Sequence, residues 1–385
     1  MIPYGRQNIS QEDIDSVCET LRSDFLTQGP KVPLLESAIC NVTQANHAVC
    51  VNSATSALHL ACLALDVSIN DEVWVSPISF VASSNCVLYC GANPVFIDID
   101  SNTNNICIKK VEEKLKTYEK LRKPMPKAII AVHLSGLSCD MKQLSNLSKK
   151  HGFSIIEDAS HAIGAHYNGS PVGCCEFSDV TVFSFHPVKI ITTGEGGAAV
   201  TNDSLLAEKI RSLRSHGVTR DKTQLKENHG PWYYEQQALG YNYRLTDIQA
   251  ALGVSQIKRL ESFINNRIQI SKFYLDSLKS LPIELPYVDS DSISSWHLFI
   301  IKLKLQAISK THKQVFEELR QEGIGVNLHY IPIYKQPYYK ENGFKNDFCE
   351  AAENYYTRAI SIPIYHGMTQ QQQQTVVNAL TKVLL

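Results

Sequence analysis

The chain has 385 residues, of which 44% are hydrophobic and 19% are charged, so it is long enough to bury a large core and to form two domains. Its 37 basic and 38 acidic side chains give a net charge of −1, which argues against a nucleic-acid-binding face and against an anionic membrane surface. No apolar run reaches the roughly 18 residues of a membrane span, and the polar, acidic segment 1–15 is not expected to be a signal peptide.

The chain contains 11 cysteines, an odd number, and none of them forms a C-x-x-C pair. Several lie in apolar runs, where a reduced thiol behaves as a small hydrophobic side chain. We therefore expect free thiols in a cytoplasmic protein, with neither a disulfide framework nor a metal site.

Strand-like and helix-like runs alternate over the first two thirds of the chain. Ser10 predicts a helix at about 11–22, because a serine hydroxyl can cap the free amides of a first turn. Short apolar or β-branched runs predict strands at 47–51, 72–75, 94–99, 128–133, 154–157, 181–185 and 198–201. Helix-like runs between these strands favour an α/β fold, in which a mostly parallel sheet carries helices on both faces.

The last third of the chain predicts a smaller α+β unit. A long helix at about 246–278 is followed by expected strands at 296–303 and 325–330 and by helices at about 312–322, 348–358 and 369–384. We expect a large domain at residues 1–260, which includes an N-terminal active-site segment, and a small C-terminal domain at residues 261–385.

Polar or aromatic side chains recur where the predicted strands end. These are Asn52–Thr55, Phe80, His133, Asp158 and Ser184. In open α/β sheets, ligands bind beyond the carboxyl ends of the strands. The sequence therefore predicts that these residues share one binding site.

Lys189 gives this site a chemical interpretation. It lies in the Gly-rich run HPVKIITTGEGG, about thirty residues after Asp158. A desolvated lysine amine is a good nucleophile for an aldehyde, and a buried carboxylate can keep a pyridine nitrogen protonated. The pair predicts pyridoxal 5′-phosphate (PLP), joined to Lys189 through a Schiff base. The simpler alternative is that Lys189 is a solvated surface charge and that Asp158 only caps a helix.

Other segments could complete a PLP site. Asn52–Ser56 would begin a helix directly after a strand, so its free amides and hydroxyls could hold a phosphate, with simple helix capping as the alternative. Ser184 could donate to the same phosphate. Phe80 would either stack on the pyridine ring or pack in the core. His161 would either lie near the phenolic oxygen or above the ring of the cofactor, or pack in the core.

The chain resembles the DegT/DnrJ/EryC1/StrS nucleotide-sugar aminotransferases in four motifs that occur in the same order: SDFLTQGPKV, EDASHAIGAHYNG, FSFHPVKIITTGEGGA and GYNYRLTDIQAALG. The resemblance covers nearly the whole chain and implies the fold of type I PLP-dependent transferases. Ala54 stands where many family members have Gly. Lys189 is present where related sugar dehydratases have His, which favours transamination.

The resemblance implies a role for each matching residue. Lys189 would be the Schiff-base lysine, and Asp158 would be the partner of the pyridine nitrogen. Further residues would contact the cofactor, with Asn242 reaching it from the neighbouring subunit of a homodimer with shared active sites: His161, Ser184, Ala54, Thr55, Phe80 and Asn242. The nucleotide sugar would be bound by Tyr4, Asp24, Phe25, Leu26, Thr27, His329 and Tyr330.

Within this family the chain looks most similar to the pseudaminic acid branch. That similarity implies transfer of the amino group of L-glutamate to C4 of a UDP-linked 4-keto-6-deoxy-N-acetylhexosamine, giving UDP-4-amino-4,6-dideoxy-N-acetyl-β-L-altrosamine. Similarity to a related branch of the family implies UDP-4-keto-arabinose as the alternative acceptor. A PLP-binding regulator or scaffold is the non-enzymatic alternative. A dinucleotide-binding protein would need a G-x-G-x-x-G turn, which Asn52–Ser56 does not contain.

Overall fold

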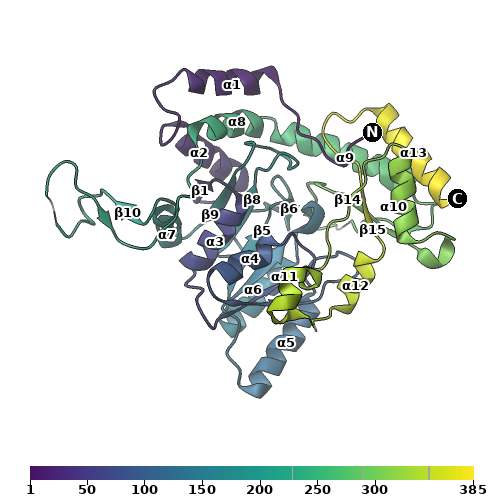
Figure 1. The fold of residues 1–385 in the computed structure, drawn as a ribbon, viewed down its shortest axis with the longest axis horizontal. Coiled ribbons are helices and arrows are strands. Elements are labelled where there is room, and N and C mark those ends of the chain that lie inside the picture. Colours follow the sequence, from purple (N-terminus) through teal and green to yellow (C-terminus); the bar gives the residue numbers. More distant parts are fainter. Residues whose placement is uncertain (228, 289, 346) are drawn as a thin grey trace.

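The computed structural model describes residues 1–227, 229–288, 290–345 and 347–385. At its centre lies a seven-stranded sheet (Figure 1). The strands from β8 to β3 run parallel to their neighbours, whereas β9 is antiparallel to both β8 and β1. The predicted mostly parallel α/β sheet is thus confirmed. Across the sheet the strands follow the order β1 (His47–Val51), β9 (Gly197–Thr201), β8 (Val180–Ser184), β5 (Ser154–Asp158), β4 (Ala128–Val132), β2 (Glu72–Val75) and β3 (Asn93–Phe96).

Apolar side chains cover both faces of this sheet. Along β2, Val73 and Val75 join the core on one face, while Trp74 joins the core on the opposite face. Near-continuous apolar strands of this kind are typical of sheets that helices cover on both sides, and Figure 1 shows this arrangement. The helices of this part are α1 (Gln11–Leu21), α2 (Lys31–Thr43), α3 (Ala54–Ala64), α4 (Ala82–Tyr89), α5 (Ile108–Leu121), α6 (Met141–His151) and α7 (Ser204–Arg214).

The helix predicted at 246–278 is in fact two helices, α8 (Asp247–Ile257) and α9 (Leu260–Ser277). Arg259 lies between them with φ −102° and ψ 3°, outside the helical range. Its side chain reaches the carboxylate of Asp13 in α1 and the main-chain and side-chain oxygens of Asn8. The break coincides with this tertiary contact and not with a proline or glycine, so the sequence pattern contains no signal for it.

The C-terminal part forms a second sheet with the order β12 (Ile283–Glu284), β14 (Phe299–Leu303) and β15 (Ala359–Ile362). The strand predicted at 296–303 begins later, at Phe299, because Trp296 has a left-handed backbone with φ +50°. The helices of this part are α10 (His312–Gln321), α11 (Pro337–Tyr339), α12 (Glu350–Tyr356) and α13 (Gln370–Leu384).

The segment predicted as a strand at 325–330 is not a strand. Within the described chain it pairs through a single bridge, between Asn327 and Ser361 of β15. The N-terminal residues occupy its other side: the amide of Gly325 donates to the carbonyl of Ile2 at 2.7 Å. A Cβ on Gly325 would lie 2.8 Å from that carbonyl oxygen, so this approach needs a glycine.

Helix α9 contributes to two cores. Phe263 and Ile264 pack with the core beside β8 and β9, whereas Ile270 and Tyr274 pack with the core of the C-terminal sheet. One helix thus joins the two parts of the chain. The division at residues 260 and 261 stays a prediction.

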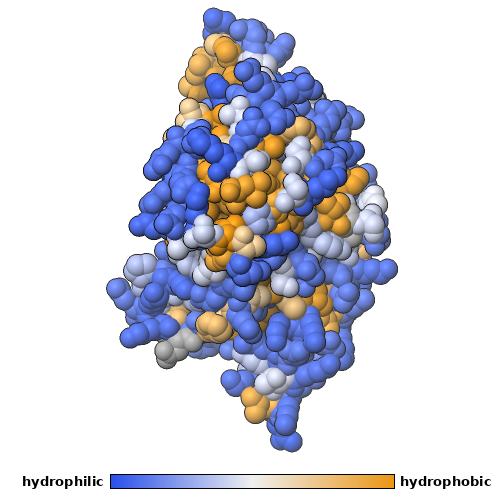
Figure 2. Space-filling model, turned by 90° about the vertical axis from the view of Figure 1, so that its right-hand side faces the viewer, coloured by the Kyte–Doolittle hydropathy of each residue, from blue (hydrophilic) through white to orange (hydrophobic). Residues whose placement is uncertain are grey.

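Smaller elements lie at the periphery. Strands β10 (Val218–Thr219) and β11 (Glu235–Gln236) belong to an arm that projects away from the body (Figure 1). A further small sheet has the order β13 (Ser292–Ile293), β6 (His166–Tyr167) and β7 (Ser170–Pro171). Seen from the side of the C-terminal part, the surface is largely hydrophilic, with hydrophobic residues visible near the middle of the face (Figure 2). Across the described ranges, no helix is both long and apolar enough to cross a membrane.

Candidate active site

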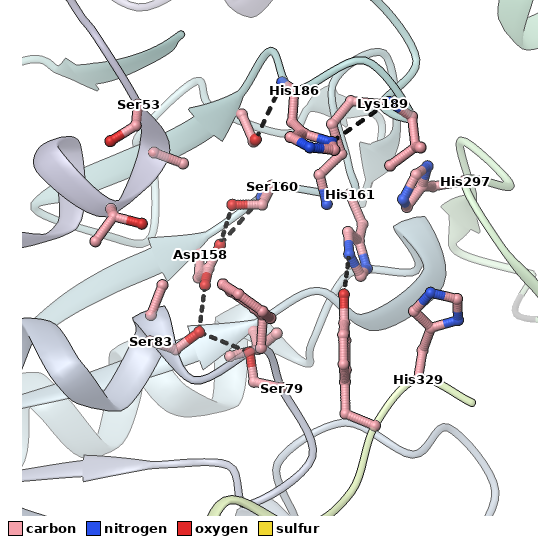
Figure 3. Close-up of a pocket in the computed structure, with 18 of the residues that line it drawn as sticks. Ser53, Ser79, Ser83, Asp158, Ser160, His161, His186, Lys189, His297 and His329 are labelled. Carbon is pink, nitrogen blue, oxygen red and sulfur yellow. Dashed lines mark hydrogen bonds between the residues drawn. The ribbon is translucent and has the colours of Figure 1, made fainter. Parts of the chain in front are cut away.

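A cavity of about 600 Å³ lies at the carboxyl ends of β5 and β8, beside the start of α3 (Figure 3). The C-terminal part closes it from the opposite side with the segment 327–330. This is the place at which ligands bind in open α/β sheets. Ten of the predicted site residues line it: Tyr4, Ala54, Thr55, Phe80, Asp158, His161, Ser184, Lys189, His329 and Tyr330.

The first turn of α3 forms one end of the cavity. Ser53 is its N-cap, with an extended backbone, and its hydroxyl oxygen accepts the amide proton of Ser56 at 3.1 Å. The amides of Ala54 and Thr55 precede any intrahelical partner, and together with the helix dipole they favour an anion. Gly197 lets this turn approach β9, because a Cβ there would lie 2.5 Å from the amide nitrogen of Ala54.

One of the predicted hydroxyl donors faces away from the cavity. The hydroxyl of Ser56 donates to the side-chain oxygen of Asn52 at 2.6 Å, and Ser56 is not among the lining residues. Ser53 and Thr55 do line the cavity, as does Ser184 at the end of β8. An anion at this end would therefore meet amides and up to three hydroxyls.

Asp158, the last residue of β5, is held in place by donors. Its Oδ1 accepts from the amide of Ser160 at 3.2 Å and from the hydroxyl of Ser160 at 2.6 Å, and its Oδ2 accepts from the hydroxyl of Ser83 at 2.6 Å. The Ser83 oxygen in turn lies 2.6 Å from that of Ser79. Three donors therefore hold the side chain of Asp158, which is 5% exposed, in one orientation. Asp158 caps no helix in this structure, so the simpler alternative is wrong.

Lys189 follows β8 in a loop that returns to β9. The loop is closed by hydrogen bonds from the amide of Thr193 to the carbonyl of Phe185 at 3.0 Å and from the amide of Phe185 to the carbonyl of Gly196 at 2.9 Å. Burial lowers the pKa of the Lys189 amine to about 8, although the Asp158 carboxylate acts in the opposite direction. Roughly a tenth of this amine is therefore neutral and nucleophilic at pH 7, far more than for a lysine with the ordinary pKa.

Three histidines lie around the inner wall. The ring of His161 is 4.4 Å from that of His297 and hydrogen-bonds Tyr330 at 3.1 Å. Burial, followed by the positive charge of Lys189, keeps the pKa of His161 well below its usual value. The same two causes lower the pKa of His329 to about 3. The imidazoles are therefore neutral, and Lys189 is the cation of this wall.

Phe80 and Tyr4 are two aromatic residues that line the cavity. Phe80 is 60% exposed and lies with its ring centre 6.3 Å from that of Tyr330. Its exposure excludes the alternative of a core aromatic and leaves its ring free to stack on a ligand. Tyr4 lies across the cavity, 5.2 Å from the ring of His329.

Five of the residues to which the resemblance gave a role lie outside the cavity. Asp24, Phe25, Leu26 and Thr27 are exposed in the loop between α1 and α2, where the carbonyl of Leu26 accepts from the amide of Asp247 at 3.0 Å. Asn242 is exposed and bridges to Ser215. A single copy of the chain therefore does not bring these residues to the site.

His133 also ends a strand without reaching the site. It is fully buried, and its Nε2 lies 2.6 Å from a carboxylate oxygen of Glu157. Its Nδ1 accepts the amide proton of Cys139 at 3.1 Å. Both nitrogens are thus used in packing the strands behind the cavity, so the expectation that His133 joins the binding site is wrong.

Several lining residues were not predicted from the sequence. Ser79 precedes α4 and Ser83 lies in its first turn, so no helical spacing in the sequence indicated that their side-chain oxygens would lie 2.6 Å apart. No sequence signal indicated His297 either, because it comes from the C-terminal part, where Arg267 of α9 donates to its carbonyl at 3.2 Å. The other unpredicted lining residues are Ser160, His186, Val188, Glu195, Asn327 and Leu328, together with the apolar Leu58, Ala82 and Val132.

The donor set fits PLP. Amides and hydroxyls at the start of α3 suit a phosphate, the Asp158 carboxylate suits a protonated ring nitrogen, and the Lys189 amine suits an aldehyde. All three groups face one cavity.

Comparison with known proteins agrees with this chemistry. The chain is 39% identical over 390 residues to the UDP-4-amino-4,6-dideoxy-N-acetyl-β-L-altrosamine transaminase of Campylobacter jejuni, and the match covers 100% of this chain and 98% of the relative. Among solved structures, Helicobacter pylori PseC, an aminotransferase involved in the biosynthesis of pseudoaminic acid, superimposes with a TM-score of 0.89 at 34% identity, covering 100% and 99% of the two chains.

A second solved structure is the sugar aminotransferase Spr1654 of Streptococcus pneumoniae in its PMP form. It matches with a TM-score of 0.91 at 30% identity and covers 100% of this chain and 99% of its own. The model of the DegT/DnrJ/EryC1/StrS aminotransferase family matches residues 7–381. The expectation of an enzyme of this kind is confirmed: the chain belongs to the DegT/DnrJ/EryC1/StrS aminotransferase family.

Proposed function

We propose that this protein is a cytoplasmic, PLP-dependent aminotransferase of pseudaminic acid biosynthesis. It transfers the amino group of L-glutamate to C4 of a UDP-linked 4-keto-6-deoxy-N-acetylhexosamine, giving UDP-4-amino-4,6-dideoxy-N-acetyl-β-L-altrosamine. The observation that carries the proposal is the common cavity of Lys189, Asp158 and the first turn of α3. The substrate rests on the Campylobacter and Helicobacter relatives.

Each part of the cavity has a role in holding the cofactor. The amides of Ala54 and Thr55, with the hydroxyls of Ser53, Thr55 and Ser184, bind the phosphate. Asp158 would hold the ring nitrogen with its proton. Phe80 would stack on the ring. When bound, PLP supplies an aldehyde and a protonated ring that withdraws electrons from the reacting carbon.

Lys189 would act as the general base and then as the general acid of the transamination. Its neutral amine would take the α-proton of glutamate as a base and then release it as an acid within the same site. With the keto sugar it acts in the reverse order. The pKa of about 8 keeps both forms of Lys189 available near neutral pH, as a group that alternates between base and acid requires. The neutral histidines do not add competing acids to this wall.

The sugar nucleotide binds on the side of the C-terminal part. Tyr4, His329 and Tyr330 border the space that remains beyond the cofactor end of the cavity. The loop that contains Asp24–Thr27 presents Phe25 and Leu26 at 52% and 47% exposure, which is high for large apolar side chains. We assign this loop and Asn242 to the site of a second copy of the chain, in a homodimer with shared active sites.

The proposal is tested by the release of 2-oxoglutarate from purified protein with L-glutamate and one of two acceptors. The expected acceptor is UDP-2-acetamido-2,6-dideoxy-β-L-arabino-4-hexulose, and the comparison acceptor is UDP-4-keto-arabinose. Two half-reactions at one site predict ping-pong kinetics. Lys189→Ala is the matched control and should abolish release with either acceptor.

The outcomes separate the alternatives. Turnover with the hexulose alone supports the pseudaminic assignment. Turnover with the arabinose derivative alone would change the assigned substrate to UDP-4-keto-arabinose and would leave the assignment as an aminotransferase in place. A protein that binds PLP but turns over neither acceptor nor glutamate would be the regulator or scaffold, and the proposed function would then be wrong.

A further inference from the structure

A turn after β4 directs a main-chain amide into the wall of the cavity. Ser135 has φ +57° and ψ 4°, the left-handed conformation that is uncommon for residues other than glycine. Two contacts hold this turn against the C-terminal part: the amide of Ser295 donates to the carbonyl of Gly136 at 3.2 Å, and the amide of Leu298 donates to the carbonyl of Ser135 at 3.4 Å. The amide of Ser135 is thereby aimed at the ring of His161.

This amide determines which nitrogen of His161 carries the proton. The amide nitrogen of Ser135 lies 3.2 Å from Nδ1 of His161, and a main-chain N–H can only donate. Nδ1 must therefore be the unprotonated acceptor, and the single ring proton of a neutral imidazole is on Nε2. An imidazolium would direct an N–H at the Ser135 amide, which the geometry disfavours. The low pKa of His161 agrees with the neutral form.

The position of the ring is fixed from the backbone as well. The hydroxyl of Ser295 donates to the carbonyl of His161 at 2.6 Å, and His161 is 5% exposed. A ring held at its main chain and at Nδ1 has little freedom to turn. The direction of its remaining N–H is therefore set by the fold.

Nε2 of His161 lies 3.1 Å from the phenol oxygen of Tyr330. Because Nε2 carries the proton, the phenol oxygen is the acceptor in this hydrogen bond. The proton of the phenol must then point elsewhere, and the described residues offer no acceptor for it within hydrogen-bond distance. Tyr330 lines the cavity, so its O–H is available to a ligand there.

We propose that Ser135, His161 and Tyr330 form a directed hydrogen-bond chain that makes Tyr330 a donor to an oxygen of the sugar substrate. Ser135 and His161 are positioning residues in this chain, since they act through Tyr330. The inference rests on the proposed function for the identity of the substrate. The direction of the chain rests on geometry alone.

The place of Tyr330 favours the sugar over the cofactor as the acceptor. The cofactor residues that line this cavity come from the large sheet and its connections, whereas Tyr330 comes from the segment 327–330 of the C-terminal part. The neighbouring His329 is held there by Ser361 of β15, 2.8 Å from its Nδ1, and its carbonyl accepts from the phenol of Tyr355. The segment is thus anchored on the substrate side of the cavity.

The direction of the chain is tested by NMR of protein labelled with 15N-histidine and loaded with cofactor. The signals of His161 are assigned by their loss in His161→Gln. We expect the pattern of a neutral ring with its proton on Nε2, unchanged over the pH range in which the protein stays folded. A proton on Nδ1, or an imidazolium at neutral pH, would overturn the proposal.

The donor role is tested by kinetics of the two half-reactions in Tyr330→Phe. Loss of one neutral hydrogen bond should lower kcat/KM for the keto sugar about five- to tenfold, mainly through KM, and should leave the glutamate half-reaction within about twofold. Tyr338→Phe is the matched control, because Tyr338 is 59% exposed and lies outside the cavity.

The outcomes distinguish this inference from the proposed function. Equal losses in both half-reactions would show that Tyr330 serves the cofactor, and an unchanged keto-sugar reaction would show that it donates to no substrate oxygen; either result overturns the donor role. Absence of turnover in the unmodified protein would contradict the proposed function instead. The NMR pattern would still decide the direction of the chain.

Discussion

Replacing Lys189 by methionine should stabilise the protein when no cofactor is bound. The unmodified protein holds an amine in a cavity that lowers its pKa from 10.5 to about 8, which corresponds to about 3 kcal/mol against the charged form. Methionine retains most of the length of the side chain and carries no charge. We therefore expect Lys189→Met to raise the free energy of unfolding by about 3 kcal/mol at pH 7.

The effect should depend on pH with a defined sign. Below about pH 8 the amine is protonated in both states, so the unmodified protein bears the full cost. Between about pH 8 and pH 10.5 the unfolded chain binds a proton that the native state does not, so the stability of the unmodified protein rises with pH. Its deficit relative to Lys189→Met should therefore fall to less than about 1 kcal/mol at pH 10.

Urea unfolding of the cofactor-free proteins at pH 7 and pH 10, at one protein concentration, measures both values. Lys313→Met is the matched control, because the Lys313 side chain is 83% exposed, and it should change stability little at either pH. A Lys189→Met protein that is no more stable at pH 7 would refute the reasoning. So would a gain that is equal at the two pH values.

Three other changes test separate parts of the structure. Asp158→Asn removes the charge proposed to face the ring nitrogen of PLP and should lower kcat/KM for the proposed transamination about 10²- to 10³-fold, measured by steady-state kinetics; a loss below tenfold would contradict the assigned role. Arg259→Met leaves the fully buried Asp13 without its cation and should reduce the free energy of unfolding by about 3 kcal/mol, so an unchanged urea midpoint would speak against this anchor. Phe25→Asp tests the proposed homodimer: it should give a folded monomer with little activity, seen by sedimentation velocity together with the 2-oxoglutarate assay, and an active dimer would remove Phe25 from the proposed interface.

Local patterns were sufficient to predict the sheet and the centre of the site. The strands at 47–51 and 72–75 were predicted with their observed bounds, because a strand that is buried on both faces is a short continuous apolar run. Asp158, Ser184 and the start of α3 were placed together by the rule that parallel strands end at one edge. Lys189 was identified because a lysine amine in an apolar, Gly-rich loop can act as a nucleophile. These features depend on near neighbours in the sequence or on one general rule of topology.

Other features were decided by the tertiary structure. His297 lines the cavity because Trp296 has a left-handed backbone and the buried Arg267 donates to the His297 carbonyl. The segment 325–330 forms no strand because the N-terminal residues occupy its other side. The break at Arg259 likewise depends on contacts with Asn8 and Asp13.

The sequence by itself determined the α/β class, the lysine–aspartate pair and the helix start to which we assign the phosphate, because each depends on the periodicity or chemistry of neighbouring residues. Only the tertiary structure decided the proton position on His161 and therefore the donor direction of Tyr330. Those depend on an amide 26 residues from the ring and on a phenol 169 residues from it. Contacts at such separations leave no periodic trace in a single sequence.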